Sequence, residues 1–153
     1  MEKMATGLEE KELKMVVFAV NGKEYALDIR YVLSIERMMN ITRVPGVAPY
    51  IKGVINLRGM ITPVIDLRTR FSAGEKEWDE DTRIIIVTFG DKMVGLIVDA
   101  ASDVLSIPGA DIEPHPDLTE GETDGFIEGV IKQDNRLFNV LKIDKVLNLT
   151  EER

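Results

Sequence analysis

Residues 53–67 read GVINLRGMITPVIDL, and residues 129–143 read GVIKQDNRLFNVLKI. When Gly53 is set over Gly129, the apolar residues of the two stretches fall at the same places, although the polar residues between them differ. Each stretch consists of two apolar runs joined by a tight turn, which is typical of a β-hairpin. The shared pattern predicts an internal repeat, with one such hairpin in each half of the chain.

A second pair of hairpins supports the repeat. KMVVFAV (14–20) alternates between two faces, and the Asn21-Gly22 turn leads into the returning strand EYALDI (24–29). After an acidic connection, RIIIVTF (83–89) and KMVGLIV (92–98) show the same arrangement. Because several elements recur in the same order, a chance likeness between Val-rich and Ile-rich hairpins explains the match poorly.

The returning strands of these hairpins align when Lys23 is set over Lys92. The tetrapeptide VLSI then follows in each half, at 32–35 and at 104–107, with a small shift in offset. We interpret the two copies as a further part of the repeat.

Three short helices are predicted. Apolar residues between Asp28 and Met39 fall at helical spacing, so we expect a short helix there with Asp28 near its N-terminus. Asp66 can cap one helical turn that extends through Phe71, and Asp144 can cap a closing helix.

The predicted fold class is all-β with a few short helices. Each half supplies four or five short strands, which suffice for a small closed barrel, and closure removes exposed sheet edges. We expect two such barrels to pack together around one core. Residues 1–13 are polar and predict a mobile N-terminal tail, and residues 14–150 predict a single domain made of two barrel subdomains.

Composition narrows the class of function. The chain has 153 residues, 44% of them hydrophobic, no cysteine and a net charge of -8. The acidic balance argues against nucleic acid as the main partner. The absence of cysteine excludes disulfides and thiolate chemistry. No apolar run is long enough to span a bilayer and the N-terminus lacks a signal-peptide core, so we expect a protein that acts inside the cell.

Candidate catalytic residues are few. His115, the only histidine, lies between two prolines in an irregular segment and has no evident partner, so we interpret it as exposed and inert. Asp99 and Asp103 could form an acid–base pair, but capping and a solvated surface explain them better. Phosphate-binding glycine motifs, a serine nucleophile motif and a metal-ligand cluster are all missing from the sequence. We therefore expect no catalytic residue, no cofactor and no metal.

Surface residues remain as candidates for function. Arg58 lies in a two-residue turn, where its guanidinium would be presented to solvent and could engage a carboxylate bidentately. Val32 and Val104 lie near the ends of predicted elements, where apolar groups can stay partly exposed, although burial in the core is the default for valine.

Three segments together resemble a known family. IKGVINLRGMITPVIDLRTRF (51–71), LDIRYVLSIERM (27–38) and VGLIVDAASDVLSI (94–107) closely resemble the CheW-type coupling proteins of bacterial chemotaxis, and the likeness extends from about Lys14 to Leu149. The resemblance implies two five-stranded SH3-like barrels packed side by side and no enzyme activity. It also implies a cytoplasmic adaptor, recruited to membrane-associated arrays, that bridges chemoreceptor tips to the histidine kinase CheA. The C-terminal regulatory domain of this kinase is itself a CheW-like double barrel.

The resemblance also implies partner-binding positions. Arg58 corresponds to a family arginine implicated in partner contacts, and Gly53 and Gly59 correspond to the glycines around it. Val32 and Val104 match family valines in the two VLSI segments.

One position departs from the family pattern. The family often has an acidic residue where this sequence has Ser34, so the electrostatic contact expected there is in doubt, although Glu36 follows two residues later.

A division of labour follows as a hypothesis. A chemoreceptor tip is a helical hairpin, and an apolar trough between two barrels would accommodate a helix. We expect Val32 and Val104 to line this trough and Arg58 to contact the regulatory domain of the kinase.

Three other interpretations stay open. A scaffold outside chemotaxis could use the same barrels to recruit a different histidine kinase. A relative with an added receiver domain would need more chain than this sequence provides after the second barrel. A small-ligand enzyme or sensor with its site between the barrels would show a deep pocket with converging polar groups.

Overall fold

The computed structural model describes residues 12–74, 76–114 and 125–148. The described strands are β1 (Glu12–Val20), β2 (Lys23–Asp28), β3 (Val32–Arg37), β4 (Ile51–Leu57), β5 (Met60–Asp66), β6 (Arg83–Phe89), β7 (Lys92–Val98), β8 (Ala100–Pro108), β9 (Glu113–Pro114), β10 (Ile127–Gln133) and β11 (Arg136–Leu141). The described helical segments are η1 (Ile29–Tyr31), α3 (Leu67–Arg70), η2 (Gly109–Asp111) and α4 (Ile143–Val146). Most of the predicted tail and His115 lie outside the described residues, and β1 already begins at Glu12.

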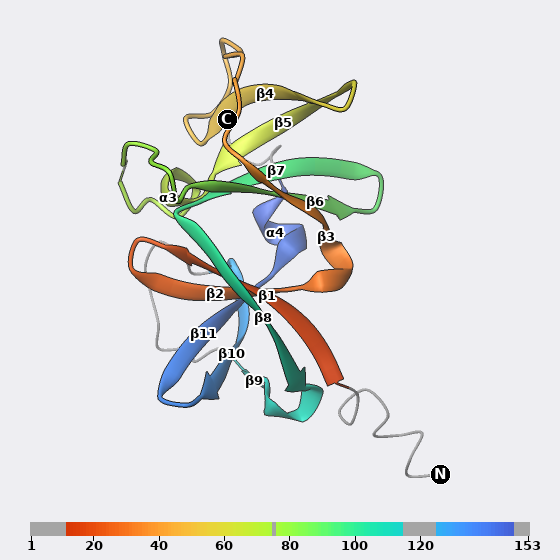
Figure 1. Cartoon of the computed structure of the whole chain (residues 1–153), viewed down its shortest axis with the longest axis vertical. Coiled ribbons are helices and arrows are strands. Elements are labelled where there is room, and N and C mark those ends of the chain that lie inside the picture. Colours follow the sequence, from red (N-terminus) through yellow and green to blue (C-terminus); the bar gives the residue numbers. More distant parts are fainter. Residues whose placement is uncertain (1–11, 75, 115–124, 149–153) are drawn as a thin grey trace.

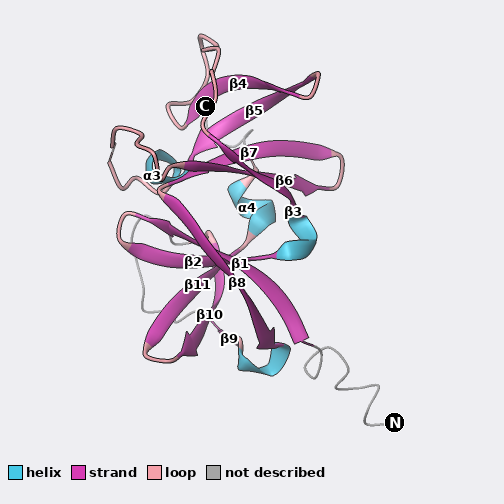
Figure 2. Ribbon diagram, viewed as in Figure 1, coloured by secondary structure: helices cyan, strands magenta, loops and turns pink. Residues whose placement is uncertain are grey.

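The strands form two sheets, one above the other, with α4 between them (Figure 1). One sheet has the strand order β8-β1-β2-β11-β10-β9, and the other has the order β3-β6-β7-β5-β4. The predicted all-β class with a few short helices is confirmed (Figure 2).

The expectation that each half of the chain builds its own barrel is wrong. The hairpin β1-β2 from the first half joins β8 to β11 of the second half, and the hairpin β6-β7 from the second half joins β3, β4 and β5. Parallel pairing of β2 with β11 and of β5 with β7 makes these two connections. The two repeats have therefore exchanged their N-terminal hairpins, and neither sheet is complete without both halves.

The two halves correspond closely along their C-terminal hairpins. The β4-β5 ladder has a register shift between Ile51 and Gly53, and the β10-β11 ladder has the same shift between Ile127 and Gly129. The predicted alignment of Gly53 with Gly129 is confirmed.

The two VLSI segments, 32–35 and 104–107, do not occupy equivalent positions in the fold. β3 pairs with β6 in the way that β8 pairs with β1, and the bulge follows Val32 in β3 and Ala101 in β8. Counted from this bulge, Ala101 occupies the place of Val32, and Val104 occupies the place of Ile35. The internal repeat is real, but the equivalent positions of β3 and β8 are not the ones that the two VLSI tetrapeptides would align.

The predicted helix after Asp28 is also wrong. Only η1 is helical, and Val32–Arg37 form the strand β3. Leu33 and Ile35 point outward from β3 but are apolar, so the segment lacks the apolar–polar alternation that identifies a strand, and Val32, Ile35 and Met39 fall at helix-like spacing. The predicted cap is correct in kind, because the Arg30 N–H donates to Asp28 Oδ1 at 2.9 Å.

Of the two other predicted caps, one is confirmed. The Arg68 N–H donates to Asp66 Oδ1 at 2.9 Å, and Asp66 begins α3. Asp144 lies inside α4 instead, since that helix begins one residue earlier with Lys142 as its N-cap, which makes no side-chain capping bond.

The chain segment that follows β3 closes the five-stranded sheet. Thr42 forms an antiparallel bridge with Val54 of β4, with N–H···O distances of 2.9 Å in both directions. A Cβ atom on Gly53 would lie 2.1 Å from the Thr42 carbonyl oxygen, so only glycine fits under this crossing.

The same closure occurs in the other sheet. β9 follows β8 and pairs with β10 next to Gly129, where a Cβ atom would lie 2.8 Å from the Glu113 carbonyl oxygen. Gly53 and Gly129 are therefore required for the same reason, because a backbone carbonyl group crosses each of them too closely for a side chain.

Three hydrophobic clusters fill the fold. One lies within each sheet, and the largest includes residues of both sheets. One face of β1 and one face of β6 pack in the cluster of their own sheet, and the opposite face of each strand packs in the shared cluster. Because both faces are buried, the sequences of these strands are almost continuously apolar. The expectation of one core shared by two barrels is confirmed for the largest cluster.

Arg70 of α3 ties the two repeats together at α4. Its guanidinium donates to the carbonyl oxygens of Lys145, Val146 and Asn148 at 3.2 Å each. The same group lies 4.3 Å from the ring centroid of Tyr50. A buried arginine from the first half thus satisfies the carboxyl end of the helix that closes the second half.

The closure makes a prediction about Gly53. A Gly53→Ala variant forces Thr42 away from Val54, and we expect it to lower the free energy of unfolding by about 2–4 kcal/mol. Gly22→Ala is the matched control, because Gly22 also has a positive φ but open space around it. Urea denaturation of both variants checks this, and a Gly53→Ala loss no larger than that of the control would contradict the closure.

Candidate partner-binding surface

β3 forms one end of the five-stranded sheet and presents two different faces. Val32, Ser34 and Glu36 are half-buried, whereas Leu33 and Ile35 are exposed. An apolar face on a strand at the end of a sheet is typical of a site for another protein.

Arg58 and Glu36 are brought together by the fold. Arg58 and Gly59 form the β4-β5 turn with φ values of 51° and 89°, and the Gly59 N–H donates to Asn56 Oδ1 at 2.8 Å. The Arg58 side chain is 68% exposed, and its Nη2 lies 3.3 Å from Glu36 Oε2. The arginine therefore lies in a tight turn with most of its side chain accessible.

Exposed apolar residues flank this ion pair along the chain. Leu33 and Ile35 precede Glu36 on β3, and Met60 and Ile61 follow Arg58 on β5. These residues are 57%, 42%, 57% and 66% exposed, respectively. These four residues are neighbours in the chain of Glu36 and Arg58, and we group all six under the name β3–β5 face, although Leu33 and Ile35 point to the opposite side of β3 from Glu36.

Sequence reasoning missed the four apolar members of this face. Leu33 and Ile35 were missed because they are apolar although they point outward, so sequence alone did not separate the two faces of β3. Ile61 carried a usable signal, because it aligns with Leu137 in the repeat and both are exposed. An apolar residue that points outward in both copies could have been identified from the hairpin alternation alone.

The remaining predicted site residues are dispersed. Val104 is 48% exposed on β8, in the six-stranded sheet, whereas Val32 lies in the other sheet and packs partly buried against the shared cluster. Gly53 is buried beneath Thr42. Ser34 is uncharged, and its Oγ is buried without a hydrogen-bond partner. It therefore does not replace the acidic side chain that the family often has at this position.

The carboxylates considered for catalysis have separate partners. Asp99 accepts a hydrogen bond from the Asn21 N–H at 2.8 Å and pairs with Arg68 at 3.0 Å. Asp103 accepts from the Val104 N–H. Burial raises the pKa of the Asp66 carboxyl above its ordinary value, against hydrogen bonds that favour its ionised form.

The described ranges contain neither a cluster of metal ligands nor a membrane-spanning helix. No group of three or more His, Cys, Asp or Glu side chains could hold a metal ion there. Among the same residues, no helix has the length and apolar content needed to cross a membrane.

These features define an interaction module built from two interlocked β-barrels, with an exposed turn arginine and apolar side chains at a strand edge. The chain belongs to the family of CheW-like domains, which matches residues 14–151. It is a coupling protein of chemotaxis, in agreement with the resemblance seen in the sequence.

Known relatives cover nearly the whole chain. The chemotaxis protein CheW of Bacillus subtilis (strain 168) is 52% identical over 88% of this chain and 86% of its own length. The chemotaxis protein CheW of Thermotoga maritima is 33% identical over 90% of this chain and 89% of its own length. The crystal structure of the scaffolding protein TtCheW from Thermoanaerobacter tengcongensis matches with a TM-score of 0.85 and 38% identity, and covers 93% of this chain and 97% of that one.

The exposure of the Glu36–Arg58 pair predicts its contribution to stability. Solvent screens a pair of this kind, so we expect its coupling energy to be below about 1 kcal/mol and to fall with added salt. A double-mutant cycle with Glu36→Gln and Arg58→Gln, followed by urea denaturation, measures this energy. A coupling energy above about 2 kcal/mol would contradict this expectation and would mean that the pair contributes substantially to the stability of the fold.

Proposed function

We propose that this chain is a non-enzymatic cytoplasmic adaptor that joins chemoreceptor tips to the histidine kinase CheA in membrane-associated arrays. The observation that carries the proposal is Arg58, an exposed arginine in a positive-φ turn that is followed in the chain by the exposed apolar residues Met60 and Ile61. Arginine and methionine are enriched at protein interfaces, and arginine is common among the residues that carry most of the binding energy.

The β3–β5 face is the proposed contact for the regulatory domain of CheA. Its apolar side chains would be covered by the partner, and the accessible part of the Arg58 guanidinium would engage a carboxylate. Glu36 holds the arginine in place before binding, which lowers the entropy lost when the complex forms. Gly59 permits the turn conformation that presents Arg58.

A separate surface on the other sheet is the proposed receptor contact. Val104 is exposed on β8, and an apolar strand face can accept one side of a receptor helix. Val32, half-buried against the shared core, would contribute at the boundary between the sheets. Gly53 would act indirectly, because it fixes the closing segment next to β4.

Weak individual contacts are sufficient for this function. An array joins many copies of each interaction, so the assembly gains strength that no single interface needs to provide. The proposal therefore requires affinities that are measurable at micromolar concentrations.

The test is co-elution of the chain with the purified regulatory domain of CheA from the same organism. We expect a shifted peak and an affinity that falls about 5–30-fold in Arg58→Ala, as for the loss of an interface arginine. Arg136→Ala is the matched control, because Arg136 is also exposed and ion-paired but lies in the other sheet. Val104→Ala should leave this affinity unchanged and weaken binding of a receptor-tip hairpin.

The outcomes separate the parts of the proposal. A shift that survives Arg58→Ala supports the adaptor and moves the kinase contact to another face. Equal loss of both partners in Val104→Ala, with the fold intact, contradicts the division between two surfaces. No shift at tens of micromolar, where transient partners meet, rejects CheA as the partner and favours a scaffold for a different kinase.

A further inference from the structure

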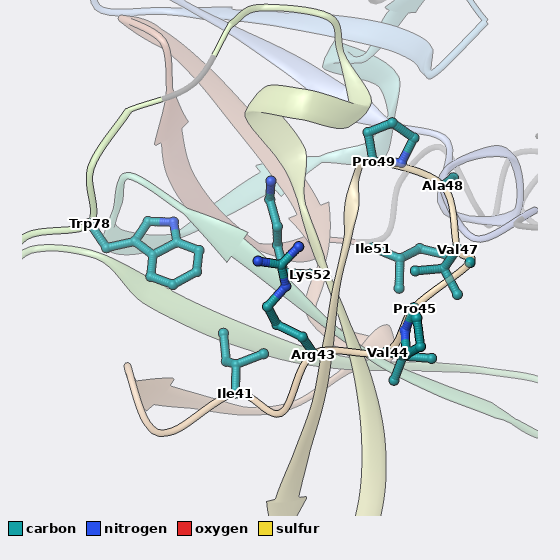
Figure 3. A pocket seen from close by; sticks show the side chains of 11 residues that line it. Ile41, Arg43, Val44, Pro45, Val47, Ala48, Pro49, Ile51, Lys52 and Trp78 are labelled. Carbon is teal, nitrogen blue, oxygen red and sulfur yellow. The ribbon is translucent and has the colours of Figure 1, made fainter.

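A pocket lies beside β4, away from the β3–β5 face. It has a volume of about 600 Å³, which is in the range of ligand-binding pockets. Its walls are the segment between β3 and β4, the start of β4 and one residue of the loop after α3 (Figure 3). The lining residues are Ile41, Arg43, Val44, Pro45, Gly46, Val47, Ala48, Pro49, Ile51, Lys52 and Trp78.

Backbone contacts hold the rim of this pocket in one shape. The Ile51 N–H donates to the Ala48 carbonyl at 2.9 Å, and the Asp66 N–H donates to the Tyr50 carbonyl at 2.8 Å. At the other end of the segment, Thr42 is bonded to β4. Two prolines restrict the backbone between these points. The pocket is therefore formed before any ligand enters.

The apolar walls stand on opposite sides of the opening. Figure 3 shows the Trp78 ring on one side and Val44, Pro45 and Val47 on the other. Trp78 is 43% exposed, and its indole N–H donates to the buried Asp66 carboxylate at 3.2 Å. Because its polar atom is already satisfied, the indole ring presents an apolar surface in a fixed orientation.

Two cations extend between these walls. The side chains of Arg43 and Lys52 lie between Trp78 and the proline-containing segment in Figure 3. None of the described residues that line the pocket is acidic, although the whole chain has a net charge of -8, and the Asp66 carboxyl behind Trp78 interacts electrostatically with Lys52. Arg43 forms no ion pair with another described residue. A positive, partly apolar concavity on an acidic protein is complementary to a ligand that is both apolar and anionic.

We propose that this pocket binds a short acidic segment of a partner protein in which an apolar side chain neighbours an Asp or Glu. The apolar side chain would pack between Trp78 and Val47, and the carboxylate would accept charge-assisted hydrogen bonds from Arg43, with Lys52 adding positive potential. This site is separate from the β3–β5 face and does not rest on the identity of the partners proposed there.

The chain carries its own reporter for this site, since Trp78 is its only tryptophan. The experiment follows Trp78 emission of the full chain during titration with the peptide acetyl-Leu-Glu-Leu-Glu-Leu-amide. The matched peptide acetyl-Leu-Gln-Leu-Gln-Leu-amide has the same shape without the charge. We expect a saturable change with the acidic peptide and about tenfold weaker binding of the neutral one.

Variants assign the response to the pocket. Arg43→Gln should lower the affinity for the acidic peptide about tenfold. Arg136→Gln, which removes a cation in the other sheet, should leave this affinity unchanged. Arg43 is exposed, so an unchanged unfolding midpoint should accompany the loss of binding.

Four results would overturn the proposal. Three of them are no saturable change at millimolar peptide, an equal response to both peptides, and a response that Arg43→Gln leaves intact. The fourth is binding of N-acetylglutamate alone as tightly as the peptide, which would make the pocket a small-carboxylate site. None of these results depends on whether CheA binds the chain.

Discussion

The closing contact at Gly53 is the constraint on which the rest of the structure depends. There the backbone of Thr42 crosses β4 so closely that no Cβ atom fits, and two backbone hydrogen bonds to Val54 complete the sheet. Gly129 has the same place under β9. Without these crossings, each sheet would end in two unpaired edges, which small sheets must avoid. The closure also fixes where the segment 41–52 lies, and that segment forms the pocket beside β4.

The exchange of hairpins makes the two barrels one cooperative unit. Since β2 pairs with β11 and β5 pairs with β7, each sheet takes strands from both halves. The shared hydrophobic cluster and the bonds from Arg70 to α4 add further contacts across the halves. A scaffold benefits from this arrangement, because the β3–β5 face and the exposed part of β8 lie on different sheets yet are held rigidly relative to each other.

Local features were predictable from the sequence, and nonlocal ones were not. Turns such as Asn21-Gly22 and Asp134-Asn135 depend on residues that tolerate positive φ, and the structure has them there. Parallel pairing between distant hairpins leaves no local signal, so the exchange could not be foreseen. Apolar residues on both faces of β3 made this strand resemble a helix in the sequence, so the outward direction of Leu33 and Ile35 was not predicted. Arg58 was predictable because a two-residue turn presents its side chain by geometry alone.

The most direct test of this account divides the chain in the loop after α3, into fragments 1–74 and 75–153. If the hairpins are exchanged, neither fragment contains a complete sheet. Each alone should then lack a cooperative urea transition, and mixing them should restore one. Trp78 emission should recover with it, because Asp66, which bonds the indole, belongs to the first fragment. A cooperative transition in either fragment by itself would show that each half builds its own barrel and would contradict the account.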